Sequence, residues 1–363
     1  MKLLNLPILA LQIITRQMDP HEVFLLSLLS LRANNRLKSI RFPPNSIWYD
    51  CVFANNTLKF ALEEMVNDYD DIVFECFGTP RANLKVEPFL MNINGKKIRC
   101  RVSVDWYGTP TLWLDESIRD SISMSIHSHI VELFNSSTDF QLRVDLENQH
   151  DLPNVPILKN VHFLSVGVEV VMSSHYLYAF FERYTVTNRA IFECRMDGEL
   201  LEDNVLEIDH LFIDDWADIS EDNLINFNGI IGTFVFADIY TENIIEFINS
   251  WLDGNNTKLK LMIVMPFNHH LIDDAILPHF ETLPFDPRRR PEKIPMPDEM
   301  EFCMERAGNV RSRPQRLLDY TGVDIIRKSD GCLATIVLEG GSFAFFVWGQ
   351  SNEQRGQNVK QDE

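Results

Sequence analysis

The residues best suited to chemistry in this sequence are a few histidines and a run of acids. His127 and His129 alternate along one segment, and His269 and His270 are adjacent, but neither pair has a third ligand at a metal-binding spacing. The acids could act as catalytic carboxylates or form a solvated surface. They are Asp209, Asp214, Asp215, Asp218, Glu221 and Asp222. Nothing apolar in the sequence is arranged to separate their pKa values, so the solvated surface is the preferred interpretation.

The six cysteines lie far apart, without a Cys-x-x-Cys pair or a short-spaced cluster with histidine. This spacing is typical of reduced structural thiols in a cytosolic or nuclear protein. The sequence also has no Gly-rich phosphate loop, no Gly-x-Ser-x-Gly elbow and no cysteine that can be paired with an activating histidine. We therefore expect no catalytic site, no cofactor and no metal, and an uncharacterised hydrolase is the least favoured function.

The composition is that of a globular chain with an acidic surface. Its 363 residues are 45% hydrophobic, which is enough to bury the core of one large domain or two ordinary ones. The formal net charge of -20 repels phosphate backbones and anionic lipids, so we expect neither nucleic acid nor membrane as a partner. Beyond the apolar start of the chain, which reaches Ile14, no apolar run approaches the roughly 20 residues needed to span a bilayer. These properties predict a soluble protein of the cytoplasm, the nucleus or both, with a protein as its partner.

The first forty residues predict short helices with defined starts. Leu11, Ile14 and Met18 recur at i, i+3 and i+7, so they share one face of a first helix. Asp19 can cap a second helix, and Glu22 can complete its capping box. The apolar start of the chain is therefore interpreted as a folded helix and not as a secretory signal.

The second helix is apolar on nearly every side from Val23 to Leu31. Such a helix must be covered all round, yet a piece of about 40 residues is at the limit of what can bury its own core. Two sources of cover are open on physical grounds. Either the rest of this chain covers the helix, which makes residues 1–41 an ordinary N-terminal subdomain, or a separate protein does.

This segment resembles the F-box, in the variant typical of the large nematode F-box families. The resemblance is carried by Leu6-Pro7, Ile14, Met18-Asp19-Pro20, Glu22-Val23 and Leu26-Ser27-Leu28-Leu29-Ser30 with Arg32. It implies that the segment binds the Skp-type adaptor of an SCF ligase, and through it a cullin and a RING subunit, and that the adaptor completes the cover of the helices. The implied adaptor-binding residues are Leu6, Pro7, Leu11, Ile14, Leu26, Ser27, Leu28, Ser30 and Arg32.

Three positions depart from the F-box pattern. Leu9 stands where the family has an acidic residue, Leu31 stands where it has a lysine, and the aromatic residue that follows is missing, with Ala33 at the next position but one. These departures keep an alternative open, namely a protein-binding scaffold outside any ligase, whose F-box no longer recruits the adaptor.

The body of the chain alternates strand and helix signals. After a proline stop at Pro43-Pro44, a boundary at residues 42–56 leads to a helix-like stretch from Leu58 to Val66 and a strand-like stretch from Asp71 to Phe77. From about residue 140, strand signals recur roughly every 20 to 30 residues, a period typical of leucine-rich-repeat-like stacking, although no repeat consensus is visible.

The clearest unit in the body is a helix from Glu242 to Leu252. Its broad apolar stripe includes Trp251, which we therefore predict to be core, and a buried strand follows from Leu259. Near the C-terminus, Asp330-Gly331 and Gly340-Gly341 predict two antiparallel hairpins, because glycine tolerates the positive φ that tight turns need.

Two stretches resemble the second type of F-box-associated domain found in the same nematode proteins. They are Phe247-Ile248-Asn249-Ser250-Trp251-Leu252-Asp253-Gly254-Asn255, behind Asp215-Trp216, and Gly322-Val323-Asp324-Ile325-Ile326-Arg327 with its hairpin. The resemblance implies an F-box at 1–41, a linker at 42–56, a substrate-binding F-box-associated domain at 57–350 and a disordered tail at 351–363. The expected fold is mixed. An all-α F-box of three short helices precedes an α/β, leucine-rich-repeat-like domain that is closed by antiparallel β-hairpins.

Together these inferences predict a substrate-receptor subunit of an SCF-type cullin ubiquitin ligase, which binds a target protein for ubiquitination and degradation and is not itself an enzyme. Binding specificity usually lies on exposed loops of a rigid scaffold. Two loops are therefore candidates for the substrate site, although their opposite charges could instead pair with each other. They are the acidic run with Asp214, Asp215 and Asp218, and a proline-bounded basic loop with Arg288, Arg289 and Arg290, which we expect to be exposed.

Overall fold

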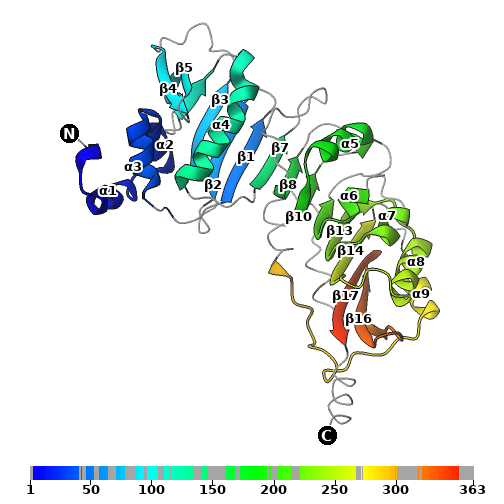
Figure 1. Cartoon of the computed structure of the whole chain (residues 1–363). Coiled ribbons are helices and arrows are strands. Elements are labelled where there is room, and N and C mark those ends of the chain that lie inside the picture. The colour runs from blue at the N-terminus through cyan, green and yellow to red at the C-terminus, as the bar shows by residue number, and fades with distance from the viewer. Residues whose placement is uncertain are drawn as a thin grey trace. The chain divides into compact units, whose positions relative to one another are not determined.

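A computed structural model of the chain shows a mixed α/β protein with short helices at its N-terminus and a sheet-rich body, as predicted (Figure 1). It divides into two compact units, Met1–Gly167 with Glu182–Val186 and Val168–Phe181 with Thr187–Glu363. The residues that the structure describes are 3–40, 42, 46–52, 57–63, 71–77, 87–93, 96–104, 110–114, 116–134, 140–145, 161–167, 172–193, 196–197, 203–213, 221–266, 271, 273–298, 300, 318 and 321–350. The expected tail at 351–363 lies outside them.

The first unit begins with helices and continues as a mixed sheet. Its helical elements are η1 (Leu3–Asn5), α1 (Ile8–Thr15), α2 (Pro20–Leu28), α3 (Leu31–Lys38) and α4 (Glu116–Phe134). Its strands are β1 (Ser46–Val52), β2 (Thr57–Glu63), β3 (Asp71–Phe77), β4 (Phe89–Ile93), β5 (Lys96–Val104), β6 (Pro110–Trp113), β7 (Phe140–Asp145) and β8 (Val161–Gly167). In space these strands follow the order β8-β7-β1-β2-β3-β6-β5-β4. The pairs β8/β7, β7/β1 and β3/β6 are parallel and the others are antiparallel.

Two expectations for the start of the body are wrong. The stretch from Leu58 to Val66 was expected to be helical, but its described part, residues 58–63, lies in β2, whose Leu62 pairs with Ile47 of β1. The expected linker at 42–56 contains β1 itself, because its aromatic and β-branched residues suit a pleated sheet. Sheet pairing on both sides of β2, with β1 and with β3, outweighs its local helical pattern. The predicted strand from Asp71 to Phe77 is confirmed as β3.

The second unit alternates strands and helices along the chain. Its elements in chain order are β9 (Met172–Ser173), α5 (Ser174–Arg183), β10 (Val186–Glu193), β11 (Met196–Asp197), α6 (Asp203–Leu206), β12 (His210–Ile213), α7 (Glu221–Asn226), β13 (Ile231–Ala237), α8 (Thr241–Leu252), β14 (Leu261–Pro266), α9 (Asp273–Ile276), η3 (Leu277–His279), β15 (Val323–Ile326), β16 (Cys332–Glu339) and β17 (Ser342–Gln350). Strands β10, β12, β13 and β14 pair in parallel in chain order. The antiparallel strands β17, β16 and β15 then continue the sheet from β14. Helix α7 contacts α6 and α8, and α8 also contacts α9, so the helices stack in the same order as the strands.

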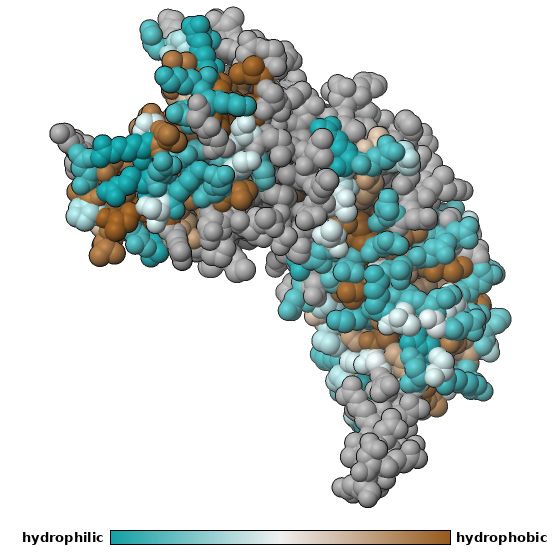
Figure 2. All heavy atoms as spheres, in the orientation of Figure 1, coloured by the Kyte–Doolittle hydropathy of each residue, from teal (hydrophilic) through white to brown (hydrophobic). Residues whose placement is uncertain are grey.

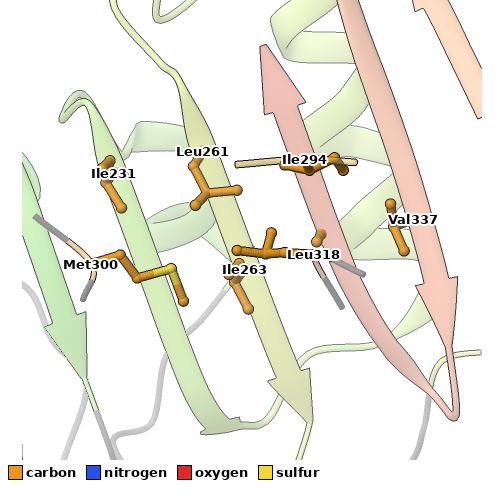
Figure 3. Packing of buried hydrophobic residues seen from close by; sticks show 8 residues of the cluster. Ile231, Leu261, Ile263, Ile294, Met300, Leu318 and Val337 are labelled. Atoms are coloured by element: carbon orange, nitrogen blue, oxygen red, sulfur yellow. The ribbon is translucent and has the colours of Figure 1, made fainter. Parts of the chain in front are cut away.

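The sheet of the second unit is covered on both faces. On one face the predicted helix, α8, packs Phe247 and Trp251 against Phe345 of β17, with ring centroids 5.6 and 5.0 Å apart. Trp251 is buried, as predicted. On the opposite face the structure describes no helix. There Ile294, Met300 and Leu318, from segments outside the sheet, cover Ile231, Leu261, Ile263, Val337 and Ala344 of the strands (Figure 3). The strands therefore bury both sets of alternating side chains.

Both predicted hairpins are confirmed at the C-terminal edge of this sheet. Gly331, between β15 and β16, has φ 70°, and Gly340 and Gly341, between β16 and β17, have φ 59° and 75°. Glycine adopts these left-handed conformations without steric cost. Asp330 stabilises the first turn, because its carboxylate accepts hydrogen bonds from the backbone N–H of Cys332 at 3.0 Å and from the Arg327 guanidinium at 2.8 Å.

Candidate partner-binding surface

The first two N-terminal helices start where the sequence predicts, but the apolar stretch Val23–Leu31, expected within the second helix, is divided, because α2 ends at Leu28 and α3 begins at Leu31. The side chain of Glu22 accepts a hydrogen bond from the backbone N–H of Asp19 at 3.1 Å, which forms one half of a capping box at α2. At α3, the Ser30 hydroxyl accepts from the backbone N–H of Ala33 at 3.1 Å. Ser30 is therefore a helix cap in this structure, and its hydroxyl is already engaged within the chain.

Two arginines of α3 hold the segment that precedes α1. The guanidinium of Arg32 donates to the Asn5 side chain at 2.9 Å, and that of Arg36 donates to the backbone carbonyl of Leu6 at 2.8 Å. These contacts join elements about thirty residues apart in sequence, so they fix α1 and α3 as parts of one helical cluster.

The nine residues expected at the adaptor interface fall into two groups. Leu11, Ser27 and Leu28 lie in the interior of the chain, so they support the helices and have no surface to offer a partner here. The others are half-buried or exposed and include Pro7, the N-cap residue of α1, which is exposed. This second group consists of Leu6, Pro7, Ile14, Leu26, Ser30 and Arg32.

The largest apolar exposure of the cluster lies at residues beside those expected ones. Leu9 and Ile13, one turn apart on the same face of α1, are 71% and 69% exposed. At the junction of α2 and α3, Leu29 and Leu31 are 68% and 55% exposed, and Ile8 is exposed at the start of α1. Figure 2 shows hydrophobic side chains on the surface over α1. We call Ile8, Leu9, Ile13, Leu29 and Leu31 the apolar patch.

The apolar patch accounts for only one side of the helices, because the chain itself covers the other. Val23 and Phe24 of α2 are buried, and α2 contacts β3 and β4 of the sheet. Phe24 also packs against the His129 ring on α4 in a T-shaped arrangement, with ring centroids 5.9 Å apart. The rest of the chain therefore covers α2, while the apolar patch stays open to a separate protein.

A serine and a histidine meet in the interior between α2 and α4. The Ser27 hydroxyl lies 2.7 Å from Nε2 of His129, at the distance that a nucleophile and its base would have. Both residues are completely buried, so no substrate can reach them. No group of three or more potential metal ligands occurs among the residues that the structure describes. His127 and His129 are structural, as the sequence favours, whereas His269 and His270 lie outside the described residues.

Acidification is expected to destabilise the first unit through these histidines. Burial lowers the pKa of both His127 and His129 from 6.5 to about 4, because imidazolium is poorly solvated inside the protein. Between these pH values the unfolded chain binds more protons than the folded one. Stability is thus complete above pH 6.5 and falls towards pH 4, by up to about 3 kcal/mol per histidine. Urea denaturation at pH 7.5 and 5.0 checks this, and His127→Gln with His129→Gln should make the dependence clearly shallower.

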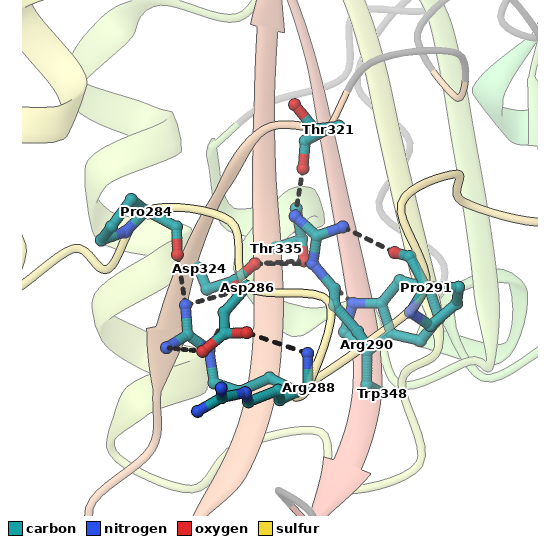
Figure 4. A network of polar contacts seen from close by, with 10 residues as sticks. Pro284, Asp286, Arg288, Arg290, Pro291, Thr321, Asp324, Thr335 and Trp348 are labelled. Atoms are coloured by element: carbon teal, nitrogen blue, oxygen red, sulfur yellow. Dashed lines mark hydrogen bonds and ion pairs between the residues drawn. The ribbon is translucent and has the colours of Figure 1, made fainter.

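The expectation that the basic loop is exposed is wrong for two of its three arginines (Figure 4). Arg290 is buried, and its Nε donates to the buried carboxylate of Asp324 at 2.7 Å. Arg289, whose side chain is 10% exposed, donates to the same carboxylate at 3.2 Å. Thr335 donates its hydroxyl to Asp324 at 2.9 Å. The loop looks like a surface charge run only because its acidic partner lies 34 residues further along the chain.

The basic loop and the acidic run were each considered as the other's partner, but the described charges pair elsewhere. Arg289 and Arg290 pair with Asp324, and a carboxylate oxygen of Asp209, in the acidic run, lies 3.3 Å from Nζ of Lys258. Of the three loop arginines, Arg288 alone has an exposed side chain that a substrate could reach. Asp214, Asp215 and Asp218 lie outside the described residues.

The two cysteines with described side chains, Cys100 and Cys332, are free and buried. Burial raises the pKa of the Cys100 thiol to about 12, so it stays protonated and unreactive at neutral pH. Both residues thus fit the expected structural thiols.

Neither a protein-family model, nor a curated protein, nor a solved structure matches this chain. Among the helices of the described ranges, none is both long and apolar enough to cross a membrane.

Sequence reasoning missed three residues of the apolar patch, Ile8, Ile13 and Leu29. A signal was present, because six of the eight residues of α1 are apolar, more than one face of a short helix can bury.

Proposed function

We propose that the chain is a substrate-receptor subunit of an SCF-type cullin ubiquitin ligase, with a Skp-type adaptor bound at its N-terminal helices and a target protein bound by its body. The observation that carries this proposal is the apolar patch, which lies in the segment that resembles the F-box. In this role the chain performs no chemistry and acts in the cytoplasm, the nucleus or both.

The physical support is the cost of leaving such side chains in water. Isolated exposed leucines are ordinary, but five large aliphatic side chains on α1, on α3 and at the junction of α2 and α3, all more than a third exposed, are characteristic of an interaction site. Complete burial of one aliphatic side chain contributes about 1.5–3 kcal/mol. A partner that covers most of the patch would therefore gain substantial affinity.

The proposal extends to the architecture of the body. Parallel strands in chain order, with helices stacked in the same order, are the arrangement expected of leucine-rich-repeat-like stacking. The antiparallel strands β15, β16 and β17 then close this array and complete the proposed F-box-associated domain.

A second candidate is a binding scaffold outside any ligase. It is favoured by Leu9 and Leu31, which make two of the positions that depart from the F-box pattern both apolar and exposed. The same patch would then bind a protein other than a Skp-type adaptor.

Charges placed on α1 should separate binding from folding. Leu9→Asp with Ile13→Asp would force two carboxylates into an apolar interface, and we expect adaptor affinity to fall by about 100-fold or more. Isothermal titration calorimetry with a purified Skp-type adaptor measures this. The matched control is Leu90→Asp on β4, a leucine 63% exposed in the same unit but outside the patch, which should bind like the parent.

If the double variant binds the adaptor as tightly as the parent does, the patch is not the adaptor-binding site. If the parent itself binds no adaptor, while the double variant loses a protein that the parent captures from cells, the scaffold function is the correct one.

A further inference from the structure

The N-terminal helices are joined to the body by contacts between side chains far apart in sequence. Ser27 and His129, 102 residues apart, meet at 2.7 Å. Lys38 at the end of α3 forms an ion pair with Glu132, one turn beyond His129 on α4. The rings of Phe42 and Phe134 lie 5.5 Å apart, at tilted planes. Helix α4 is therefore the support on which the helical cluster rests.

The hydrogen bonds at this joint define which nitrogen of His129 carries the proton. A serine hydroxyl has a single hydrogen, and the Ser27 hydroxyl donates it to the backbone carbonyl of Phe24 at 2.5 Å. The Nε2 of His129 must then be the donor to Ser27, which leaves Nδ1 as the bare nitrogen. Nδ1 is buried and has no hydrogen-bond partner among the described residues.

Addition of a second proton to His129, at Nδ1, is unfavourable. It would create an unpaired N–H and a positive charge in the interior, both of which are costly. The charges that act on His129 are Lys38 on α3, which opposes protonation, and Glu132 on α4, which favours it. Helix α2 contributes the neutral Ser27 and Phe24, and β4 contains no charged residue.

We propose that His129 is a positioning residue at a proton-sensitive joint, which holds α2 and α3 on α4 while it is neutral and releases them when it is protonated. His129 is itself inaccessible, so it acts on the apolar patch only through the helices that it holds. The use of this joint to regulate adaptor binding rests on the proposed function, but the joint itself does not.

Hydrogen exchange of the backbone amides measures the release directly. After correction for the intrinsic pH dependence of exchange, opening of residues 20–38 in the parent should be about tenfold more frequent at pH 5.5 than at pH 7.5. In His129→Gln the amide can replace the Nε2 hydrogen bond to Ser27 without titrating, so the increase should disappear. In His129→Leu, opening should be frequent at both pH values.

A control variant and the adaptor make the outcomes distinct. His127→Gln, two residues away on α4, should retain the parental increase, because no described contact joins His127 to Ser27. If the increase in opening at pH 5.5 persists in His129→Gln, or is absent in the parent, the proposed role of His129 is wrong. Saturation with a purified Skp-type adaptor should suppress opening at both pH values. If the pH dependence of opening is lost in His129→Gln but the adaptor does not suppress opening, the role of His129 is supported and the proposed adaptor function is wrong.

Discussion

Asp324→Asn is expected to destabilise the second unit by about 3–5 kcal/mol, since removal of one partner from a buried ion pair leaves an uncompensated charge. Asp324 and Arg290 are both fully buried and meet at 2.7 Å, and Arg289 shares the same carboxylate. The remaining contacts of Arg290 are to neutral groups and cannot replace the lost charge: the carbonyls of Pro291 and Thr321 and the rings of Phe285 and Trp348. Urea denaturation followed by tryptophan fluorescence would report the loss.

The neighbouring arginine provides the control for this prediction. Arg288 has an exposed side chain, so Arg288→Ala should change stability by no more than about 0.5 kcal/mol. A loss below about 1 kcal/mol in Asp324→Asn would mean that the two arginines are adequately solvated without their carboxylate. The comparison also determines how the loop can be tested as a substrate site. Only Arg288 can be reversed in charge without disturbing the fold, because reversal of Arg290 would disrupt the core.

The parts of the fold that the sequence predicts correctly are those specified by local chemistry. The helix α8 has a continuous apolar stripe and is terminated by Gly254, two residues after its last residue, whose φ of 105° suits glycine. The hairpin at Gly331 and the start of α2 at Asp19 likewise depend on residues within a few positions of each other. Such signals lie within a single short window of sequence.

The incorrect expectations concern residues whose environment comes from distant parts of the chain. Residues 58–63 carry a helix-like pattern, yet a strand forms because β1 and β3 pair with it on either side. Arg290 belongs to a run of three arginines, yet its environment is set by Asp324 and the aromatic rings of Phe285 and Trp348. A local sequence pattern contains no information about such partners.

The candidate binding surface shows the same division. The sequence locates the helices, but it cannot show which apolar side chains of a helix are covered. Ser27 and Leu28 belong to the F-box-like pattern and are buried by the body, whereas their neighbour Leu29 is exposed. His129, which holds Ser27, lies more than a hundred residues away, so its role becomes visible only in three dimensions.

Gly322→Ala should destabilise the second unit by about 3 kcal/mol or more, whereas Gly340→Ala should cost only about 1–2 kcal/mol. Both glycines have φ 59°, so the left-handed backbone penalises an added Cβ equally at the two sites. They differ in the space around that atom. A Cβ on Gly322 would lie 2.3 Å from the backbone carbonyl oxygen of Ile336, while one on Gly340 would meet nothing within 4 Å. Because the clash is with backbone of β16, relief requires a shift of β15 relative to β16, the pair that also carries Asp324 and Thr335. Urea denaturation of the two variants and the parent isolates the clash as the difference between them. Equal stabilities would show that the edge of the sheet moves freely enough to accommodate the methyl group, and that the packing of Gly322 against β16 contributes little to the fold.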